Sequence, residues 1–477
     1  MDISSALHLA LPELFLAISA LVLLLVGAIS PRSDGVLVWL LSGVALAIAA
    51  GLAAIGPLGT AFAGGFVADQ ASVFAKVAIY LMSAVALVLG SGWLGRQQAR
   101  QFEYAILVLM AALGMGVMVS SGDLISLYVG VELQSLALYV LAAFRRDDAK
   151  ASEAGLKYFV LGALSSGLLL YGASLIYGFA GSVKFAEIAA AVHAGAGAGV
   201  LFGLVFLICG LAFKVSAAPF HMWTPDVYEG APTPVVAFFA AAPKFAAMVL
   251  FARALADAFP GAADQWREVL IVIAVISMLL GAFAGLVQRN LKRLWAYSSI
   301  ANVGYALVGL SAGTHEGVQA MLVFMVLYMI DVTGFFACLL ALNRDGKPME
   351  TMDDMAGLMR ERPGMALAMT AFAVSAIGFP PFSGFWAKVY VFRAIIDAGY
   401  GWVAVVGLVS SVVAAFYYLR LVKVMWFDPP VGAVDKAPAD AKGVAYAAAL
   451  FSFPVVLIAL IGLDPLARVA ASSFGLG

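Results

Sequence analysis

Long apolar runs recur along the whole chain and are separated by short polar connections. Each run is long enough to cross the roughly 30 Å hydrocarbon core of a bilayer as a helix. Inside that core every backbone amide must be satisfied within the protein, so only helices and closed barrels can span it. We therefore predict an all-α polytopic membrane protein with about fourteen transmembrane helices. The predicted spans lie near 11–30, 36–56, 72–94, 104–120, 123–144, 153–180, 199–229, 233–256, 268–287, 294–312, 317–342, 365–399, 402–427 and 443–463.

The composition supports this class and excludes others. Hydrophobic residues make up 64% of the chain and charged residues only 12%, too few charges to cover a soluble domain. The net charge of −1 gives no indication of a nucleic-acid partner. No basic segment precedes the first apolar run, so we do not expect a removable signal peptide.

The cysteines and histidines give no sign of a redox centre or a metal site in this chain. Cys209 and Cys338 are far apart in apolar runs, which argues against a disulfide framework, a redox pair or a four-thiolate iron–sulfur cluster. The histidines are scattered, and they are His8, His193, His221 and His315. If the chain serves a redox enzyme, we expect the electron carriers to lie in other subunits.

The basic residues of the connections orient the predicted bundle. Cytoplasmic loops of membrane proteins carry an excess of Lys and Arg. Connections after even-numbered spans offer little beyond Lys184, Arg253 and Arg267. We therefore expect the odd connections to face the cytoplasm and both termini to face the periplasm of a bacterial inner membrane. The basic residues of the odd connections are Arg32, Arg96, Arg100, Arg145, Arg146, Lys150, Arg289, Lys292, Arg293, Arg344, Lys347, Arg360, Arg362, Lys436 and Lys442.

Two predicted spans are too long for one straight crossing, and proline interrupts both. The breaks lie at Ser216–Phe220 in the seventh span and at Ala376–Gly384 in the twelfth. These spans are the fourth members of two consecutive five-helix units, and an odd number of helices inverts the second unit in the membrane. Inverted repeats with matching discontinuous helices indicate an ion or substrate site near the midplane. We expect an N-terminal three-helix segment at 1–103, a first repeat at 104–262, an inverted second repeat at 263–430, and a C-terminal loop and helix at 431–477.

Acidic and basic side chains lie inside the apolar runs, where each costs roughly 2.5–3.5 kcal/mol on insertion scales. Glu132 lies in an otherwise uncharged run. It is either a proton-binding carboxyl group or a glutamate kept neutral by protonation or a nearby hydroxyl. Lys157, at the start of the sixth span, is either its partner or a lysine that reaches back to the interface.

Three further residues surround or follow the first break. Lys214 and His221 flank Pro219, and Lys244 lies in the middle of the eighth span without an acidic neighbour in sequence. A lysine transferred from water to a low dielectric releases its proton more readily, so these lysines are candidate proton carriers. The alternative for Lys244 is a fixed ion pair. His221 either passes protons or caps backbone groups at the break.

The second break is also followed by a lysine. Lys388 has apolar sequence on both sides, which favours a role in a pathway over a side chain that reaches the interface. Asp331 is another acid in the middle of a span. The sequence leaves open which lysine it would pair with.

Several segments resemble the antiporter-like membrane subunits of proton-pumping NADH:quinone oxidoreductase, respiratory complex I. The similarity covers roughly residues 104–400. The segments that carry it are Phe213–Val236 (FKVSAAPFHMWTPDVYEGAPTPVV), Leu291–Gly304 (LKRLWAYSSIANVG), Asp123–Tyr139 (DLISLYVGVELQSLALY), Glu153–Gly162 (EAGLKYFVLG) and Gly378–Lys388.

Within that family the chain is most similar to the subunit N branch, the counterpart of mitochondrial NADH dehydrogenase subunit 2. It stops at Gly477, before the lateral helix of the largest paralogue, and carries Lys388 where another paralogue has glutamate. Thr333 and Ala337 stand where the two larger paralogues have His and Lys. The resemblance implies a proton path, and Asp331 matches none of its positions. The implied proton-relay residues are Glu132, Lys214, Lys244 and Lys388, with Lys157 and His221 as supporting sites.

The resemblance implies a subunit that translocates protons while redox chemistry proceeds elsewhere. Glu132 would be the entry switch, Lys214 and Lys244 the central relay, and Lys388 the exit-side store. No cofactor is expected in this chain, since NADH, FMN, iron–sulfur clusters and quinone would be handled by other subunits. The expected partners are other complex I membrane subunits, including a paralogous antiporter-like subunit, and the lipid bilayer. The alternative is a subunit of a multisubunit cation/proton antiporter without a redox partner, because related chains occur there.

Overall fold

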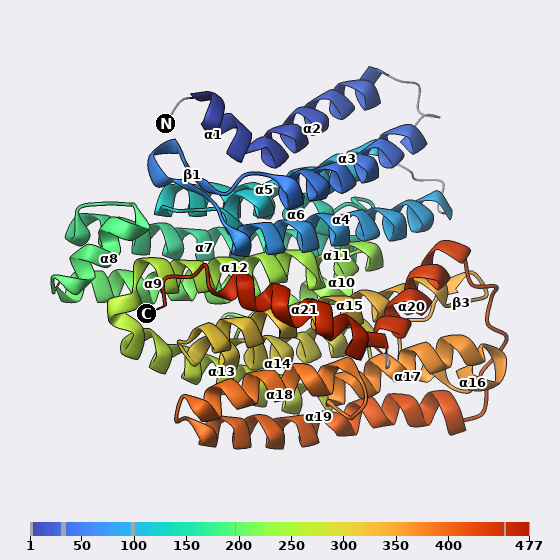
Figure 1. The fold of residues 1–477 in the computed structure, drawn as a ribbon. Helices are drawn as coiled ribbons and strands as arrows, with labels where there is room; N and C mark the ends of the chain where they lie inside the picture. Colours follow the sequence, from blue (N-terminus) through green and yellow to red (C-terminus); the bar gives the residue numbers. More distant parts are fainter. Residues whose placement is uncertain (1–2, 30–34, 97–100, 196, 453–454, 477) are drawn as a thin grey trace.

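The computed structural model describes residues 3–29, 35–96, 101–195, 197–452 and 455–476, and for 455–461 only the backbone. These residues form a bundle of long helices that run side by side (Figure 1). Eleven helical segments of this described part are long and apolar enough to cross a membrane. The predicted all-α membrane class is therefore confirmed.

The N-terminal part of the bundle contains three long helices and one small hairpin, in which β1 pairs antiparallel with β2. The next part holds two interrupted spans, because α9 is followed by the separate helix α10 and α11 by α12. The elements of both parts are α1 (Ile3–Leu9), α2 (Leu11–Ile29), α3 (Gly35–Ile55), β1 (Gly59–Ala61), η2 (Phe62–Gly64), β2 (Phe66–Ala68), α4 (Gln70–Arg96), α5 (Phe102–Val119), α6 (Leu124–Ala142), α7 (Ala149–Ala180), α8 (Phe185–His193), α9 (Ala198–Val215), α10 (Trp223–Gly230), α11 (Thr233–Ala240) and α12 (Ala242–Ala258).

The C-terminal half also contains an interrupted span, with a break between α17 and α18 at the predicted second proline site. Its elements are η3 (Pro260–Ala262), α13 (Ala263–Gly285), α14 (Leu291–Ser311), α15 (His315–Ala341), β3 (Asn343–Arg344), β4 (Lys347–Pro348), η4 (Asp353–Met355), α16 (Leu358–Glu361), α17 (Pro363–Ile377), α18 (Ser383–Asp397), α19 (Gly401–Phe427), α20 (Ala439–Phe451) and α21 (Val455–Ala471).

Side-chain caps fix where several helices begin. The Asp123 carboxylate accepts the Ser126 amide at 2.6 Å at the start of α6, and Asn290 accepts the Arg293 amide at 3.0 Å at the start of α14. Such caps satisfy amides that have no partner within the helix. They place the first residue of each span at a defined depth.

Glycines let neighbouring helices approach backbone to backbone. A Cβ atom added to Gly130 of α6 would lie 2.7 Å from the Met118 amide nitrogen of α5. On α7, a Cβ atom at Gly172 would lie 2.7 Å from the Gly203 carbonyl oxygen of α9. In lipid, moving an apolar side chain from a lipid contact to a helix contact gives no hydrophobic free energy. Close packing of the helix backbones is therefore a main source of helix association.

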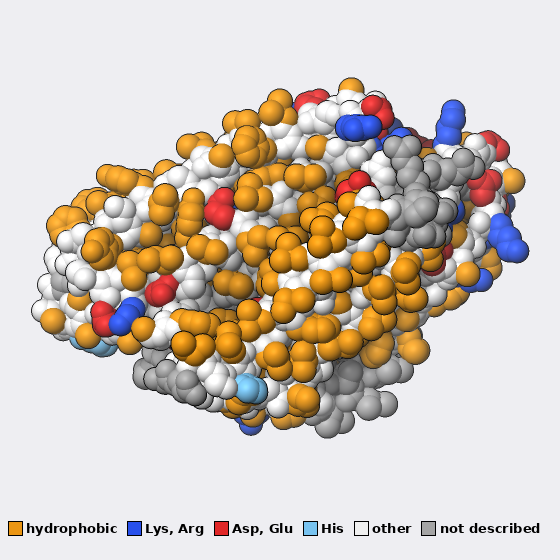
Figure 2. Space-filling model, turned by 90° about the horizontal axis from the view of Figure 1, so that it is seen from above, with side chains coloured by type: hydrophobic (Ala, Val, Ile, Leu, Met, Phe, Trp, Pro, Cys, Tyr) orange, Lys and Arg blue, Asp and Glu red, His pale blue; other side chains and the backbone are white. Residues whose placement is uncertain are grey.

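The most enclosed helices lie at the centre of the bundle. All residues of α11 are buried, as are all residues of α12 except Asp257, and most of α14 and α15 is buried as well. Helices such as α2, α3 and α19 instead expose leucine, isoleucine and valine side chains. Figure 2 shows such an apolar face, with most Lys and Arg side chains in view gathered at one end.

The two ends of the bundle differ in the segments they carry. Both chain ends lie at the end where α8 is found, and β3 and α16 lie at the opposite end (Figure 1). The first and last described segments of the chain therefore lie at the same end of the bundle. Arg32 and Arg100, which contributed to the predicted orientation, lie outside the described residues.

Two spans that the sequence presents as continuous are divided in the structure. The eighth is interrupted at Ala241, whose φ of −104° and ψ of −99° separate α11 from α12. Pro243 explains this break, because it lacks an amide hydrogen and restricts the residue before it. The last apolar run is shared between α20 and α21, and the sequence places Pro454 between them.

Candidate functional site

The first buried charge cluster joins α6, α7 and the end of α9. The Lys214 Nζ lies 3.9 Å from Glu132 Oε1, and its side chain is only 6% exposed. Ser166 of α7 donates its hydroxyl to the same carboxylate oxygen. Lys214 Nζ also donates to Ser135 Oγ at 2.9 Å and to Ser166 Oγ at 3.3 Å. A carboxylate and an ammonium group are thus linked directly and through a hydroxyl.

The position of Lys214 follows from the helix break beside it. It occupies the last turn of α9, which ends at Val215 and is followed by Ser216 with a φ of +66°. The backbone groups freed by the break find partners, since Trp223 Nε1 donates to the Phe213 carbonyl at 3.1 Å and Ser277 Oγ accepts the Ala218 amide at 2.8 Å. Irregular backbone at this depth is tolerated because protein surrounds it.

Lys157 is not the partner of Glu132, so this interpretation of the sequence is wrong. Its Nζ lies 2.7 Å from Glu153 and 2.8 Å from Asp226, and Arg293 approaches Asp226 at 2.6 Å. The side chain is 42% exposed and borders an open cavity of about 160 Å³. Lys157 therefore belongs to a partly exposed ionic cluster, nine residues before Ser166, the residue of α7 that contacts Glu132.

Lys244 lies at the centre of the bundle, at the start of α12 directly after the Ala241 break. It is 1% exposed. Its Nζ donates to Ser299 Oγ on α14 at 2.5 Å and lies 5.2 Å from the centre of the Tyr228 ring. In the described part of the chain it makes no ion pair, so the alternative of a fixed pair is wrong.

A polar connection continues from Lys244 toward the second half of the bundle. Tyr328 of α15 donates its hydroxyl to the same Ser299 Oγ at 2.7 Å. Tyr328 also borders a small cavity of about 30 Å³, whose other polar walls include Asp331 and Lys388. A cavity of roughly 10–15 Å³ is enough for one water molecule when polar partners are present.

Lys388 is buried against the end of the broken helix α17. Its Nζ donates to the carbonyl oxygens of Ala376 at 3.0 Å and Ile377 at 2.9 Å, and to Ser411 Oγ at 3.0 Å. It also lies 4.5 Å from the centre of the Tyr305 ring. The last carbonyls of a helix carry partial negative charge and attract a cation. The side chain is 6% exposed, so it does not reach the membrane interface.

Asp331 of α15 pairs with no lysine in the described residues. Its carboxylate accepts hydroxyl groups from Ser375 at 2.6 Å, from Ser383 at 3.0 Å and from Ser452. These serines come from the end of α17, the start of α18 and the residue after α20. The acid that the sequence left without a partner is thus held by hydroxyl groups alone.

His221 lies in the break between α9 and α10 and is partly buried. Its Nδ1 is buried without a hydrogen-bond partner. Among the described residues, it forms no hydrogen bond or ion pair with Glu132, Lys214 or Lys244. The structure therefore separates His221 from the hydroxyl-linked groups.

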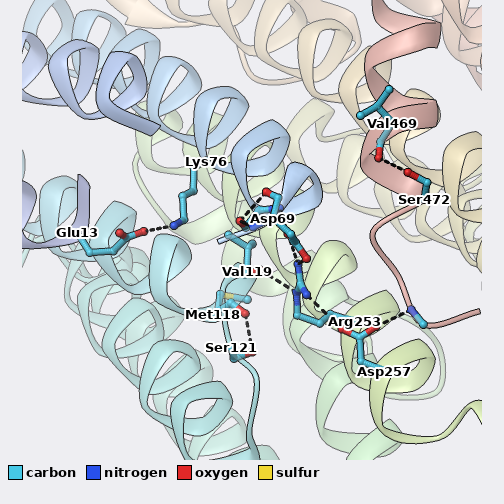
Figure 3. A network of polar contacts seen from close by, with 12 residues as sticks. Glu13, Asp69, Lys76, Met118, Val119, Ser121, Arg253, Asp257, Val469 and Ser472 are labelled. Atoms are coloured by element: carbon cyan, nitrogen blue, oxygen red, sulfur yellow. Dashed lines mark hydrogen bonds and ion pairs between the residues drawn. The ribbon is translucent and has the colours of Figure 1, made fainter. Parts of the chain in front are cut away.

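A second polar network, which the sequence analysis did not identify, lies among α4, α5, α12 and the C-terminal residues (Figure 3). Arg253 is 1% exposed, although the sequence suggested a residue of a connection. It donates to both oxygens of Asp69 at 2.8 and 2.9 Å, to Asp257 at 3.1 Å and to the Val119 carbonyl at 3.0 Å. Because a guanidinium does not lose its proton in proteins, this network stays charged.

Figure 3 also shows a buried ion pair nearer the N-terminus. Lys76 Nζ of α4 lies 2.7 Å from Glu13 Oε1 of α2, and Tyr80 donates a long hydrogen bond to the same oxygen. Both partners are almost fully buried. The pair holds α2 against α4. Among the described residues it forms no hydrogen bond or ion pair with Lys214, Lys244 or Lys388.

The sequence analysis also did not identify the serine and tyrosine residues of the site. Ser166, Ser299 and Tyr328 link charged groups that lie on different helices. The only sign of these residues in the sequence is a hydroxyl side chain within an apolar run. That signal is weak, because serine hydroxyls in helices often bond to their own backbone, as Ser135 does with the Val131 carbonyl at 2.7 Å.

Comparison with known proteins gives consistent matches. The family described as NADH:quinone oxidoreductase/Mrp antiporter, TM, matches residues 121–414. The NADH-quinone oxidoreductase subunit N of Caulobacter sp. (strain K31) is 72% identical over 390 residues, which are 80% of this chain and 81% of that protein. A chain of respiratory complex I from Thermus thermophilus with bound aureothin is 34% identical, with a TM-score of 0.81 over 96% of this chain and 99% of that one. A chain of the Mrp complex from Dietzia sp. DQ12-45-1b shares the fold, with a TM-score of 0.85 at 22% identity over 98% of each chain.

Proposed function

The chain belongs to the family of membrane subunits shared by NADH:quinone oxidoreductases and Mrp antiporters, within its subunit N group, and we propose a route by which it moves protons. It is a proton-translocating membrane subunit of NADH:quinone oxidoreductase, respiratory complex I. Quinone reduction takes place elsewhere in that complex.

The proposed route runs through Glu132, Lys214, Lys244 and Lys388. The observation that carries it is Lys244, an ammonium group at the centre of the bundle whose hydrogen-bond partner is a hydroxyl and not a carboxylate. A charged group without a counter-ion is costly in a low dielectric unless it can lose its charge. A group that can exist in both states is suited to pass a proton on.

The mechanism is electrostatic coupling between neighbouring groups. Glu132 and Lys214 form the entry pair, and loss or gain of charge at one changes the proton affinity of the other. At an effective dielectric constant near 20, unit charges about 4 Å apart interact by about 4 kcal/mol. Lys244 receives the proton at the midplane, and Lys388 stores it beside the carbonyl end of α17. Lys157 and His221 remain supporting sites in this proposal, although in the described part of the chain neither contacts Glu132, Lys214 or Lys244.

We assign the redox cofactors to other subunits. NADH, FMN, the iron–sulfur clusters and quinone lie outside this chain in the proposal, so the subunit is driven by conformational or electrostatic changes in its neighbours. The proposed partners are other membrane subunits of the complex, including a paralogous antiporter-like subunit, and the surrounding lipid of a bacterial inner membrane. Both termini face the periplasm, because most basic connections lie at the opposite end of the bundle.

The chain further divides into an N-terminal segment at 1–103, two inverted five-helix repeats at 104–262 and 263–430, and a C-terminal segment at 431–477. The breaks at α9–α10 and α17–α18 support this division, because each places a buried lysine beside interrupted backbone. Inverted repeats with paired broken helices are a common way to build a transport site at the midplane.

A cation/proton antiporter subunit without a redox partner is the rival function. The likeness to the Mrp chain supports the shared fold, whereas the 72% identity to a subunit N supports the oxidoreductase. Purification of the tagged chain from native membranes in mild detergent separates the two. We expect NADH:quinone reductase activity to copurify with it, and copurification with antiporter subunits that lack NADH oxidation would favour the rival.

The relay is tested by substitution in the assembled complex. We expect Lys244→Ala and Lys214→Ala to lower NADH-driven proton translocation at least about tenfold, the range of a lost acid–base group. Lys244→Arg should also fail, because guanidinium retains its proton. Lys184→Ala is a matched control, since this lysine is exposed and pairs only with Glu187 at 3.1 Å. Normal pumping by both alanine variants would show that the route is wrong.

A further inference from the structure

We propose that Asp331 is a second proton-carrying acid of this subunit and that it exchanges a proton with Lys388 across the cavity that both groups border. The inference rests on the proposed function and extends it to a residue that has no position in the resemblance described above. It concerns the second half of the bundle, where the route otherwise contains lysine but no carboxyl group.

The surroundings of Asp331 suit either protonation state. The side chain is buried, with 9% of the residue exposed, and its hydrogen-bond partners Ser375, Ser383 and Ser452 are all hydroxyl groups. A hydroxyl donates to a carboxylate and, after rotation about its C–O bond, accepts from a carboxylic acid. The hydrogen bonds of this site can therefore survive the arrival of a proton.

The Arg253 network provides a contrast within the same molecule. There Asp69 and Asp257 each pair directly with a guanidinium that cannot give up its proton, so both carboxylates have a cationic partner. Asp331 has no cation within ion-pair distance in the described part of the structure. A buried carboxylate without a cation is costly unless it can be neutralised, and protonation neutralises it.

Lys388 is the group from which the proton comes. Its ammonium contacts two carbonyls and the Ser411 hydroxyl and no carboxylate. The cavity of about 30 Å³ between the α14, α15, α17 and α18 walls is bordered by both Lys388 and Asp331, and it is large enough for a bridging water. Proton transfer converts the ammonium and carboxylate into a neutral amine and a carboxylic acid. The total charge of the pair is zero before and after, so the step moves a proton without adding net charge to the site.

The arrangement parallels the entry pair. Glu132 and Lys214 lie beside the break that follows α9 and share the Ser166 hydroxyl. Asp331 and Lys388 lie beside the break between α17 and α18, where Ser375 and Ser383 contact the acid. With Asp331 included, each broken helix has one acid and one lysine. Tyr328, on the same cavity, connects this second pair to Ser299 and Lys244.

The competing explanation is structural, because the serine contacts of Asp331 also tie α15 to α17, α18 and the end of α20. Substitution distinguishes the two. Asn has nearly the shape of Asp and keeps an acceptor oxygen for the serines but cannot ionise, whereas Glu keeps the acid. We expect Asp331→Asn to lower NADH-driven proton translocation about tenfold per assembled complex. Asp331→Glu should retain more than about half of it, because it preserves the exchangeable proton.

The experiment uses the complete complex in membrane vesicles, with the two Asp331 variants, Asp257→Asn and Lys244→Ala measured in parallel. Asp257→Asn is the matched control, a partly buried acid of the Arg253 network that lies outside the route, and it should pump as the parent does per assembled complex. If Asp331→Asn pumps normally while Lys244→Ala does not, Asp331 is structural and only this inference fails. If Lys244→Ala also pumps normally, the proposed route itself is wrong.

A second measurement covers the case in which Asp331→Asn does not assemble. Infrared difference spectra of the parent complex, recorded between its resting and quinone-reducing states, should contain a carboxylic C=O band. That band should shift in Asp331→Glu and stay in place in Asp257→Asn. A spectrum in which no carboxylic band differs between the parent and Asp331→Glu would overturn the proposal.

Discussion

Replacing Glu132 by Gln removes the charge that faces Lys214 and leaves the shape of the side chain nearly unchanged. Gln still offers an oxygen to the Ser166 hydroxyl, so the hydrogen bond that joins α6 to α7 can form. What disappears is the ability of this position to become charged. The substitution therefore separates a structural glutamate from one that acts by ionising.

The lost interaction can be sized from the geometry. Glu132 Oε1 lies 3.9 Å from Lys214 Nζ, and both groups are largely shielded from solvent. With an effective dielectric constant near 20, this separation gives an attraction of about 4 kcal/mol. If only a third of this coupling drives the transfer that limits the rate, its loss slows that step about tenfold. We therefore expect Glu132→Gln to translocate protons at about a tenth of the parent rate or less.

Glu132→Asp provides the comparison, because it keeps the charge and only shortens its reach. The expected order of proton translocation is Glu, then Asp, then Gln. The assay is NADH-driven acidification of inverted membrane vesicles, followed with a pH-sensitive dye and divided by the amount of assembled complex. Equal rates for the parent and the Gln variant would assign Glu132 a structural role and would leave the entry side of the route without an acid.

Three further predictions follow from packing and orientation. Arg253→Met should weaken the assembled subunit by about 3–5 kcal/mol, because the largely buried carboxylates of Asp69 and Asp257 lose their cation. Thermal dissociation in detergent measures this loss, and the number of protons moved per NADH oxidised in the surviving complex should match the parent. Gly130→Leu should prevent assembly, since a Cβ atom there would lie 2.7 Å from the Met118 amide nitrogen, and native gel electrophoresis would show normal complex if α5 and α6 can separate at little cost. Cysteine tags at the two chain ends should react with an impermeant reagent added outside intact cells, and protection of both would reverse the proposed orientation.

Much of the membrane topology is local information and could be obtained from the sequence. A run of about twenty apolar residues has no stable alternative to a helix in lipid, so its presence alone predicts a span. The breaks at Pro219 and at Pro380 were predictable for a similar reason, since proline removes a backbone donor wherever it stands. The buried lysines were also visible, because a charge inside an apolar run is costly in any bilayer-spanning fold and indicates function.

The pairing of those charges was decided by the tertiary structure alone. The sequence left Lys157 open as a partner of Glu132, but helix packing brings Lys214 beside Glu132 and turns Lys157 toward Asp226. The hydroxyl partners of Asp331 lie on three other segments, and the partner farthest along the sequence is Ser452. These contacts depend on the depth, rotation and spacing of helices that pack through small residues and non-directional dispersion forces. The residue pattern within one helix does not show which face another helix will meet. The spans therefore follow from the sequence, whereas the contacts among the buried charged groups depend on the packed bundle.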